Sequence, residues 1–341
     1  GKTTTLKATN DRLEEEGLLR RISRGAYTGV AASNMGSGSR TLTAMFRLAS
    51  TNKLTGELLK LTEQEMEDLD QELGAMAVLE VDEISMIERL LLAFIHKRLQ
   101  EWRKEKYHPR YCKGRTCRCG AKLPFGGVKL VLAGDWGQMP PVAVAPTKTL
   151  LYAGICKQGV NKSDVNLGLR LFKNINTVVR LRRIHRQAGA SLYKESLIRL
   201  RDAAHTKEDV ELWKTHDLTS PTCTFTPEQR QKFETDSLHL FTENRKAGQR
   251  NGVSVGEHAV KQGFHFLRIW SVDSSAMVER HTCDCYGQLR RVLHLASGSR
   301  MMLIMNLRTC RSLVNGLRGT LVAVVLKETL ALQPATTQVR K

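Results

Sequence analysis

Two short, continuous apolar runs in the first half of the chain each end abruptly in polar residues. The first, AVLEV at 77–81, is followed by Asp82 and Glu83, and the second, VKLVL at 128–132, leads through AG into DWGQ. Continuous apolar runs of this length are typical of strands buried in a parallel sheet. Open α/β sheets carry their chemistry at the carboxyl ends of strands, so we expect the functional site at these two ends.

Segments with helical periodicity alternate with these strands. Residues 5–19 and 53–74 have the amphipathic spacing of helices, and residues 25–49 read as a short strand, a turn and a Gly/Ser-rich loop. The alternation predicts an α/β fold. Glu80 is a charge inside the first strand, which predicts that one face of that strand is partly solvated.

The chain opens with Gly1-Lys2-Thr3, the last third of the phosphate-binding pattern GxxxxGK[ST]. In that pattern backbone N–H groups cradle phosphates, the lysine reaches the β/γ oxygens and the threonine ligates Mg²⁺. Three residues alone are weak support, but the helical segment that follows would place the phosphates at a helix N-terminus. Because the chain starts inside the pattern, we expect it to be a fragment that does not work as a complete motor.

The polar residues at the two strand ends suit phosphoryl transfer. Asp82 can hold Mg²⁺, Glu83 can orient and deprotonate the attacking water, and Gln138 can contact the γ-phosphate or that water. An isolated Asp-Glu pair is common on protein surfaces. The preceding apolar strand and the upstream Lys2-Thr3 favour the catalytic interpretation.

Charge points to a polyanionic partner. The 341 residues carry a formal net charge of +19, and 41% are apolar, which is enough to bury the cores of two domains. A chain this basic favours nucleic acid over a membrane surface, and no apolar run is long enough to cross a bilayer. The eight cysteines are typical of reduced intracellular thiols when no secretory leader is present. A basic protein without a nucleic-acid role is the simpler alternative.

Residues 97–122 combine ten Lys/Arg with aromatic side chains and three cysteines. Basic residues interleaved with rings suit a single nucleic-acid strand, so we interpret this stretch as a basic insertion that contacts one. The aromatic residues are Trp102, Tyr107 and Tyr111. The cysteines Cys112, Cys117 and Cys119 lack a standard zinc spacing, and zinc would need a fourth ligand from His108 or the pair Cys283 and Cys285.

The segment VVRLRRIHRQ at 178–187 predicts a short strand that leads into clustered arginines. An arginine supplied to a phosphate site stabilises transition-state charge, and a nucleic-acid surface is the competing interpretation. The candidates are Arg180, Arg182, Arg183 and Arg186. Further on, LHLF at 238–241 predicts a strand before a helix, and Asn315-Gly316 predicts a tight turn between two strands.

In order, the motifs GKT, TGVAAS, VDEISM, GDWGQMPPV, RIHRQ, LFTENRKAGQRN and GSRMMLIMNL…LVNGLRGT resemble the RecD/Pif-like DNA helicases of superfamily 1. The resemblance runs over nearly the whole chain. It implies two RecA-like P-loop NTPase domains with parallel sheets, at 1–178 and 179–341, the second incomplete. It also implies ATP and Mg²⁺ as cofactors, single-stranded DNA and DNA junctions as partners, and 5′ to 3′ translocation coupled to duplex unwinding. Repair, recombination or telomere maintenance, in the nucleus or mitochondrion, are the roles that the family suggests.

The resemblance also implies individual roles. Gly1, Lys2, Thr3 and Thr4 would bind ATP, Thr3 and Asp82 would ligate Mg²⁺, Glu83 would be the catalytic base, and Gln138 the γ-phosphate sensor. The RQ pairing selects Arg186 as the arginine finger. Thr28, Gly29, Ala31 and Ala32, together with Asn244 and Arg245, would contact DNA. Trp136 stands where the family usually has Phe.

Two other functions fit the same residues. A degenerate module could hold nucleic acid without ATP turnover, and an RNA helicase of the same superfamily would share these motifs. The sequence ahead of Gly1 would separate the first from an ATPase, because a hydrolytic site needs the complete glycine-rich loop. Stimulation of ATP hydrolysis by DNA or by RNA would separate the second.

Overall fold

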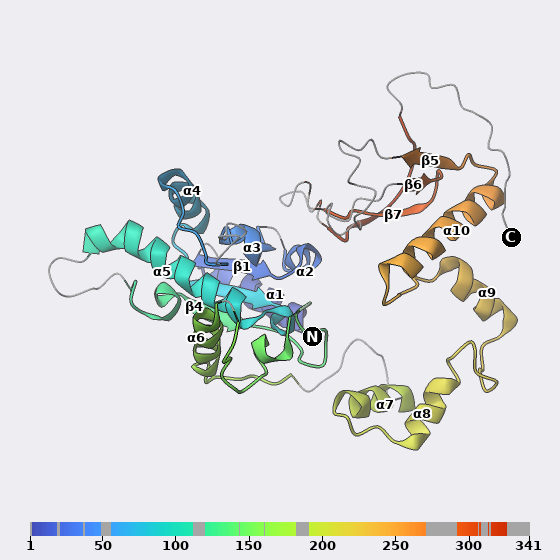
Figure 1. Ribbon diagram of the computed structural model, residues 1–341, viewed down its shortest axis with the longest axis horizontal. Coiled ribbons are helices and arrows are strands. Elements are labelled where there is room, and N and C mark those ends of the chain that lie inside the picture. Colours follow the sequence, from blue (N-terminus) through green and yellow to red (C-terminus); the bar gives the residue numbers. More distant parts are fainter. Residues whose placement is uncertain are drawn as a thin grey trace. The chain divides into compact units, whose positions relative to one another are not determined.

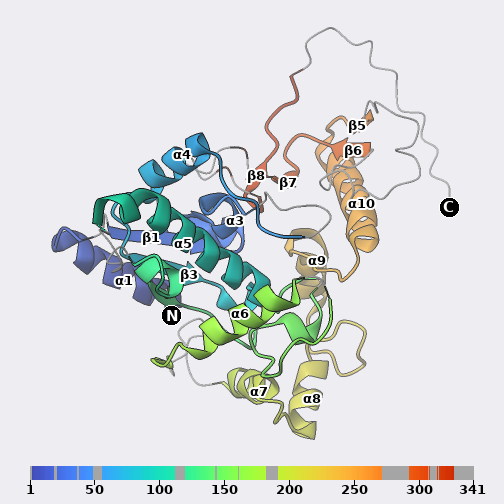
Figure 2. The same cartoon turned by 60° about the vertical axis from the view of Figure 1, so that its left-hand side comes forward.

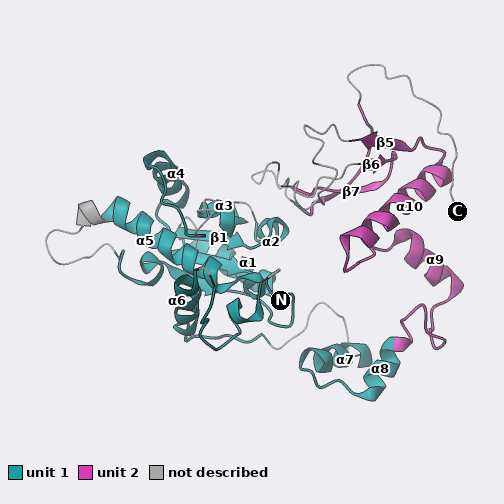
Figure 3. Ribbon diagram, in the orientation of Figure 1, with its two compact units in different colours: residues 1–213, 306–315 teal, residues 214–305, 316–341 magenta. Residues whose placement is uncertain are grey.

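The chain divides into two compact units, shown in teal and magenta in Figure 3. The first comprises residues 1–213 with 306–315, and the second 214–305 with 316–341. The computed structural model describes residues 2–18, 21–36, 38–48, 56–111, 120–142, 144–159, 161–181, 191–270, 292–305, 307, 313 and 315–325, and for 108–111 the backbone only. The expected division into RecA-like domains at 178 and 179 stays a prediction.

A parallel sheet forms the centre of the first unit, with strand order β2-β1-β3-β4 (Figure 1). The strands are β1 (Ile22–Ala26), β2 (Arg40–Thr41), β3 (Val78–Asp82) and β4 (Lys129–Leu132). Ala26 pairs with Asp82 and Val81 with Leu132, so the carboxyl ends of the three longer strands share one edge. The two apolar runs of the sequence are thus confirmed as neighbouring parallel strands.

Helices cover both faces of this sheet (Figures 1 and 2). On one face lies α1 (Lys2–Glu15), and on the other lie α3 (Leu42–Met45), α4 (Glu63–Leu73) and α5 (Arg89–Tyr111). The unit also contains α2 (Gly29–Asn34), α6 (Lys162–Lys173), α7 (Leu192–Arg201) and α8 (Lys207–Lys214), with 3₁₀ turns η2 (Ile84–Met86), η3 (Pro124–Gly127) and η4 (Pro146–Lys148). Side chains alternate along β3, so Leu79 and Val81 face the core with α5, whereas Glu80 and Asp82 face α1.

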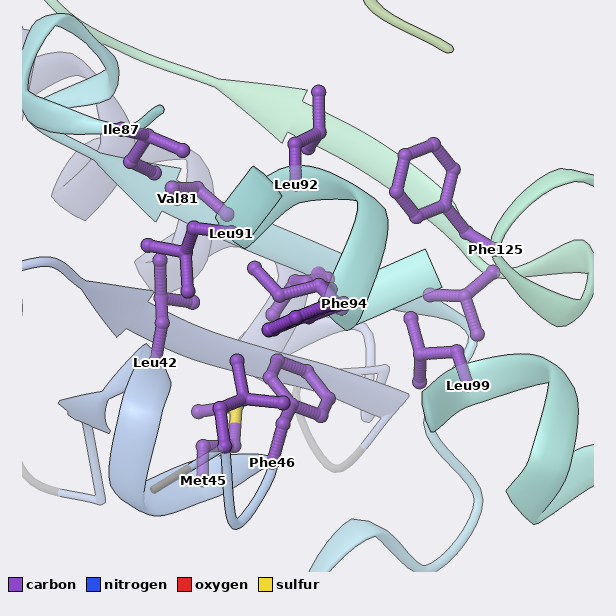
Figure 4. Packing of buried hydrophobic residues seen from close by; sticks show 14 of the residues in the cluster. Leu42, Met45, Phe46, Val81, Ile87, Leu91, Leu92, Phe94, Leu99 and Phe125 are labelled. Carbon is purple, nitrogen blue, oxygen red and sulfur yellow. The ribbon is translucent and has the colours of Figure 1, made fainter. Parts of the chain in front are cut away.

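The hydrophobic core lies between the sheet and helices α3, α4 and α5. Figure 4 shows Leu42, Met45 and Phe46 around α3 opposite Leu91 and Phe94 of α5. Met66, Leu69 and Leu73 add the buried face of α4, which confirms the amphipathic pattern. Burial of apolar side chains on this scale is the main stabilising contribution to the sheet and its helices.

Helix α6 packs against α5 at a point where only glycine fits. A Cβ on Gly168 would lie 2.7 Å from the carbonyl carbon of Arg89, closer than any side chain can approach. The Arg89 side chain is fully buried and donates to the backbone oxygens of Thr149 (2.8 Å), Gly154 (2.9 Å) and Tyr152. These bonds fix the 149–154 segment beside α5.

Helices α7 and α8 form a hairpin held by buried polar contacts. Arg199 donates two hydrogen bonds to Asp209, at 2.8 and 2.6 Å, and Trp213 Nε1 donates to Ser196 Oγ at 2.9 Å. The bonds from Arg199, followed by that from the Thr206 backbone, hold the pKa of Asp209 well below its usual range. Burial of Asp209, which is 3% exposed, acts in the opposite direction, so the bonds from Arg199 and Thr206 are what keep this carboxylate ionised.

The second unit contains two helices and two antiparallel strand pairs among its described residues. They are α9 (Pro227–Asp236), α10 (Asn244–Gln262), β5 (Leu267–Trp270) with β6 (Val292–Leu295), and β7 (Arg300–Met302) with β8 (Arg318–Thr320). Gly316 has a φ of 91° in a turn just before β8. The predicted tight turn between two strands does not join β7 to β8, because residues 303–317 separate them and Leu303 forms backbone hydrogen bonds with Gly316 and Leu317. None of the helices in the described ranges combines the length and apolar character that crossing a bilayer requires.

Three expectations about strands are wrong. β4 is partly exposed, with Val131 42% accessible, because in the described part of the chain it pairs with β3 alone. Residues 178–181 and 238–241 form no strand; Val178 is 81% and Leu240 87% exposed. The apolar pattern was present in both segments, but the described residues offer them no pairing partner.

Candidate nucleotide site

Helix α1 begins at Lys2 and brings its first turn against the end of β3. Thr3 Oγ1 donates a hydrogen bond to Asp82 Oδ2 at 3.2 Å, and Lys2 Nζ lies 3.9 Å from Glu83 Oε2. Residues separated by some eighty positions therefore meet as the motifs predict. Gly1 lies outside the described residues, and Thr4 is exposed beside Thr3.

Asp82 is 2% exposed and keeps both carboxylate oxygens engaged. Oδ2 accepts from Thr3, and Oδ1 accepts from the backbone N–H of Glu83 at 2.8 Å. A threonine hydroxyl and an aspartate carboxylate in contact are the protein ligands that Mg²⁺ takes beside a nucleotide, the remaining positions being filled by phosphate and water. These two residues fit a magnesium ion.

Glu83 stands in the left-handed region, with φ 56° and ψ 48°. That conformation turns the chain sharply from β3 into η2, and the side chain stays partly accessible. Its Oε2 is buried and has no hydrogen-bond partner among the described residues, although Lys2 Nζ lies near it. A carboxylate oxygen that accepts no hydrogen bond and lies beside the Lys2 ammonium can accept a proton from water.

The second strand end lies at the same edge of the sheet. The backbone N–H of Ala133 donates to Val81 O at 2.7 Å, and that of Ile84 donates to Ala133 O at 3.0 Å. Gly134 permits this approach, because a Cβ there would lie 3.0 Å from Ile84 N. The turn that follows carries Gln138, whose side chain is exposed.

The segment predicted to touch DNA begins at this edge as well. Thr28 caps α2, its hydroxyl accepting from the backbone N–H of Ala31 at 3.3 Å. Gly29 and Ala32 are buried, and Ala31 packs on the small cluster formed by Ala26, Ala32 and Met35. Gly29 and Ala32 thus expose little of their surface, and their contact with DNA stays a prediction.

In the second unit, Asn244 and Arg245 are the first two residues of α10, and both side chains are exposed. The helix predicted after the polar segment is confirmed. Arg182, Arg183, Arg186 and the cysteines at 112, 117, 119, 283 and 285 lie outside the described residues. Among the residues that are described, no group of three or more His, Cys, Asp or Glu side chains gathers as a metal site.

The interpretation of residues 97–122 as a nucleic-acid surface is wrong for its described aromatic residues. Trp102 is fully buried and donates to Asp70 Oδ1 at 2.8 Å, and Tyr107 donates to Gly74 O at 3.2 Å. Arg103 stacks on both rings and donates to Met76 O at 3.0 Å. These rings hold α5 against α4, so they cannot stack on bases.

The sequence reasoning missed a buried polar pair behind the site. Asn10 Nδ2 donates to Glu80 Oε2 at 2.9 Å; the two side chains are 4% and 3% exposed. Glu80 is thus buried beneath α1, and the solvated strand face expected from it is wrong. A signal was present, since Thr3 and Asn10 are seven residues apart on one helix face and Asp82 and Glu80 share one strand face.

Burial raises the pKa of the Glu80 carboxyl, and the hydrogen bond from Asn10 and the charge of Arg24 act in the opposite direction. Arg24 also donates to Met35 O at 3.3 Å, at the end of α2. This pair joins α1, which begins with Lys2 and Thr3, to β3, which ends at Asp82. It is therefore placed to set the spacing between the two halves of the site.

A parallel sheet with Lys2 and Thr3 at a helix start, and an acidic pair at the end of the neighbouring strand, defines a P-loop NTPase. The family model of the PIF1-like helicases matches residues 1–211. The chain therefore belongs to the PIF1-like helicase family.

Curated relatives and solved structures agree with this assignment. The ATP-dependent DNA helicase PIF1 of Danio rerio is 28% identical over 211 residues, which cover 58% of this chain and 27% of that protein. The Xenopus laevis PIF1 is 26% identical over 307 residues, covering 87% and 39%. The chain thus spans between about a quarter and two fifths of the length of these relatives.

Two crystal structures of Pif1 helicases share the fold. The Bacteroides Pif1 in complex with ADP-AlF3 and ssDNA has a TM-score of 0.59 at 21% identity, covering 95% of this chain and 64% of that one. The Candida albicans Pif1 has a TM-score of 0.56 at 20% identity, with 96% and 64% covered. The α/β fold expected from the motifs is confirmed by this likeness and by the parallel sheet of the first unit. The strand pairs described in the second unit are antiparallel.

Proposed function

We propose that this chain is part of the motor of an ATP-dependent DNA helicase that translocates 5′ to 3′ on single-stranded DNA and unwinds duplexes and junctions. The observation that carries the proposal is the meeting of Lys2 and Thr3 with Asp82 and Glu83 at one sheet edge. The names of the relatives, ATP-dependent DNA helicase PIF1, support the substrate class.

The residues divide the work of hydrolysis. ATP with Mg²⁺ supplies the phosphoryl group and part of the charge that stabilises its transfer. Gly1, Lys2 and Thr4 bind the phosphates at the start of α1, while Thr3 and Asp82 hold the metal. Glu83 orients the attacking water and takes its proton, which its Oε2 permits because that oxygen accepts no hydrogen bond among the described residues.

Gln138 contacts the γ-phosphate or the attacking water, so its contacts differ between ATP and ADP. Arg186 stabilises the charge that develops during transfer. Thr28, Gly29, Ala31 and Ala32 contact the DNA strand, and α2 supports this by starting at the edge where the nucleotide binds. Asn244 and Arg245 contribute from the second unit.

A DNA helicase acts inside the cell, where its substrate is. We place this one in the nucleus or mitochondrion, in DNA repair, recombination or telomere maintenance. A fluorescent fusion of the full-length protein tests the compartment. Unwinding of partial duplexes that carry either a 5′ or a 3′ single-stranded tail tests the polarity.

The central test replaces Glu83 by Gln in the full-length protein. Removing the base should lower DNA-stimulated ATP hydrolysis by about 10²- to 10⁴-fold while ATP still binds. Steady-state hydrolysis with and without single-stranded DNA measures the effect. The matched control is Glu80→Gln, the same change three residues earlier on β3, which keeps an acceptor for Asn10 and should leave turnover near that of the wild type.

Two results would contradict the proposal. Wild-type protein that binds DNA but shows no hydrolysis sensitive to Glu83→Gln would identify a binding module without turnover. Hydrolysis stimulated by RNA and not by DNA would identify an RNA helicase.

A further inference from the structure

The turn that carries Gln138 is held by hydrogen bonds of its own. The backbone N–H of Gln138 donates to Asp135 O at 3.0 Å, and that of Gly137 donates to Asp135 Oδ1, also at 3.0 Å. Side-chain bonds of this kind let aspartate stabilise a tight turn. The Asp135 carboxylate is therefore part of the framework that orients the backbone under Gln138.

Arg201, the last residue of α7, binds the same carboxylate oxygen. Its Nη2 lies 2.9 Å from Asp135 Oδ1. One oxygen thus accepts from the turn's own backbone and from a helix much further along the chain. Such charge-assisted bonds are stronger and more directional than neutral ones.

Gly137 leaves the space that this contact needs. A Cβ at Gly137 would lie 3.0 Å from Cγ and 3.2 Å from Nε of Arg201. The aliphatic part of Arg201 therefore runs against the turn's backbone. Any larger residue at 137 would push the arginine aside.

A second helix holds the turn through its aromatic residue. The Trp136 ring meets Phe172 of α6 edge to face, with centroids 5.8 Å apart. The turn is thus fixed by α6 through Trp136 and by α7 through Asp135, while the Gln138 side chain is exposed. A polar group must be supported in this way to meet a ligand in one geometry.

We propose that Arg201 is a positioning residue for ATP hydrolysis, holding the turn at 135–138 so that Gln138 meets the γ-phosphate in a constant geometry. The inference rests on the proposed function. Because Arg201 is 54% exposed, its ion pair contributes little to folding. Loss of the ion pair should therefore lower kcat and leave stability nearly unchanged. Arg201 also joins the sensor turn to the helix that begins six residues after Arg186.

The test measures DNA-stimulated kcat and the KM for ATP of the full-length protein. R201Q and D135N should each lower kcat by about ten- to a hundredfold, since a small misplacement of a reacting group has effects of this size. KM should stay within about twofold, the pattern of an interaction that matters mainly in the transition state. R201K retains a charge that reaches Asp135 and should recover most of the loss.

Two further variants test the route of the effect. If Arg201 acts through Asp135, the double variant R201Q/D135N should be no slower than the slower single variant. The control is R170Q, which removes an exposed arginine of α6 that has no ion pair within the described residues. Its kcat should match the wild type, and the melting temperature of every variant shows that it is folded.

The outcomes separate this inference from the proposed function. Wild-type kcat in folded R201Q, a rise in KM alone, or losses that multiply in the double variant would each overturn the role of Arg201. A wild-type protein whose ATP hydrolysis is absent, or insensitive to Glu83→Gln, would instead overturn the proposed function, and with it this inference.

Discussion

At the scale of single residues, the site is built on a strained backbone at Glu83 and a carboxylate oxygen of that residue that accepts no hydrogen bond among the described residues. Glu83 has the left-handed dihedrals φ 56° and ψ 48°, which cost a non-glycine residue about 1–3 kcal/mol. The hydrogen bond from its N–H to Asp82 Oδ1 stabilises the conformation. This left-handed conformation turns Glu83 away from the direction of β3, so that the adjacent carboxylates of Asp82 and Glu83 have different surroundings.

Glu80 offers a test of the buried pair behind the site. Its pKa is raised by burial, so the folded protein holds this proton more tightly than the unfolded chain does. Stability from this group is therefore present below the unfolded pKa, about 4.3, and is lost as pH rises through the folded value. We therefore expect the free energy of unfolding of Glu80→Gln, relative to that of the wild type, to be higher at pH 7 than at pH 4.

Urea denaturation of both proteins at the two pH values measures this difference. Glu80→Leu is the contrasting variant, because it leaves the Asn10 amide buried without an acceptor and should lower the free energy of unfolding by about 1–3 kcal/mol. A Leu variant as stable as the Gln variant would show that the Asn10 bond contributes nothing.

Motif spacing was enough to predict Lys2, Thr3, Asp82 and Glu83 as one group, because covalent order and the parallel sheet bring helix start and strand end together. The pairs Asn10–Glu80 and Asp135–Arg201 were not predicted. Each pair depends on how one element packs on another. The sequence of a helix gives the same pattern whether a polar residue faces solvent or bonds to a neighbouring element, so the pattern cannot predict the pair.

At the scale of elements, the contact between α5 and α6 depends on Gly168. A methyl group there would press on the backbone of Arg89, and the side chain of that residue fixes the 149–154 segment. Gly168→Ala should therefore lower the free energy of unfolding by about 1–3 kcal/mol or more, despite the better helix propensity of alanine.

The matched control is Gly256→Ala in α10, where a Cβ would meet nothing within 4 Å. That change should raise stability by about 0.5–1 kcal/mol through helix propensity alone. Hydrogen exchange of the amides in α5 and α6 measures the effect of Gly168→Ala, and exchange in α10 measures that of Gly256→Ala. Equal effects at both positions would refute the close packing of α6 on α5.

Periodicity predicted the helices and the central strands of the first unit better than it predicted the edges. β3 is buried because it has neighbours on both sides, whereas β4 has one among the described residues and exposes Val131. Trp102 and Tyr107 were predicted to lie on a basic surface and instead join α5 to α4. Composition cannot tell a ring in a core from a ring on a surface.

At the scale of the whole molecule, the net charge of +19 predicts binding that depends strongly on salt. Displacing counterions from several phosphates should weaken binding of single-stranded DNA steeply between about 50 and 200 mM salt. Fluorescence anisotropy of a labelled oligonucleotide gives the slope. Affinity independent of salt would contradict electrostatic contact with the backbone.

Three of the four tryptophans differ widely in their exposure. Trp102 is fully buried, Trp136 is 40% exposed one residue after Asp135, and Trp270 in the second unit is 66% exposed. Indole emission shifts with the polarity around the ring, so these environments are spectrally distinct. Trp136 thus places a fluorophore, without any label, two positions from the proposed γ-phosphate sensor.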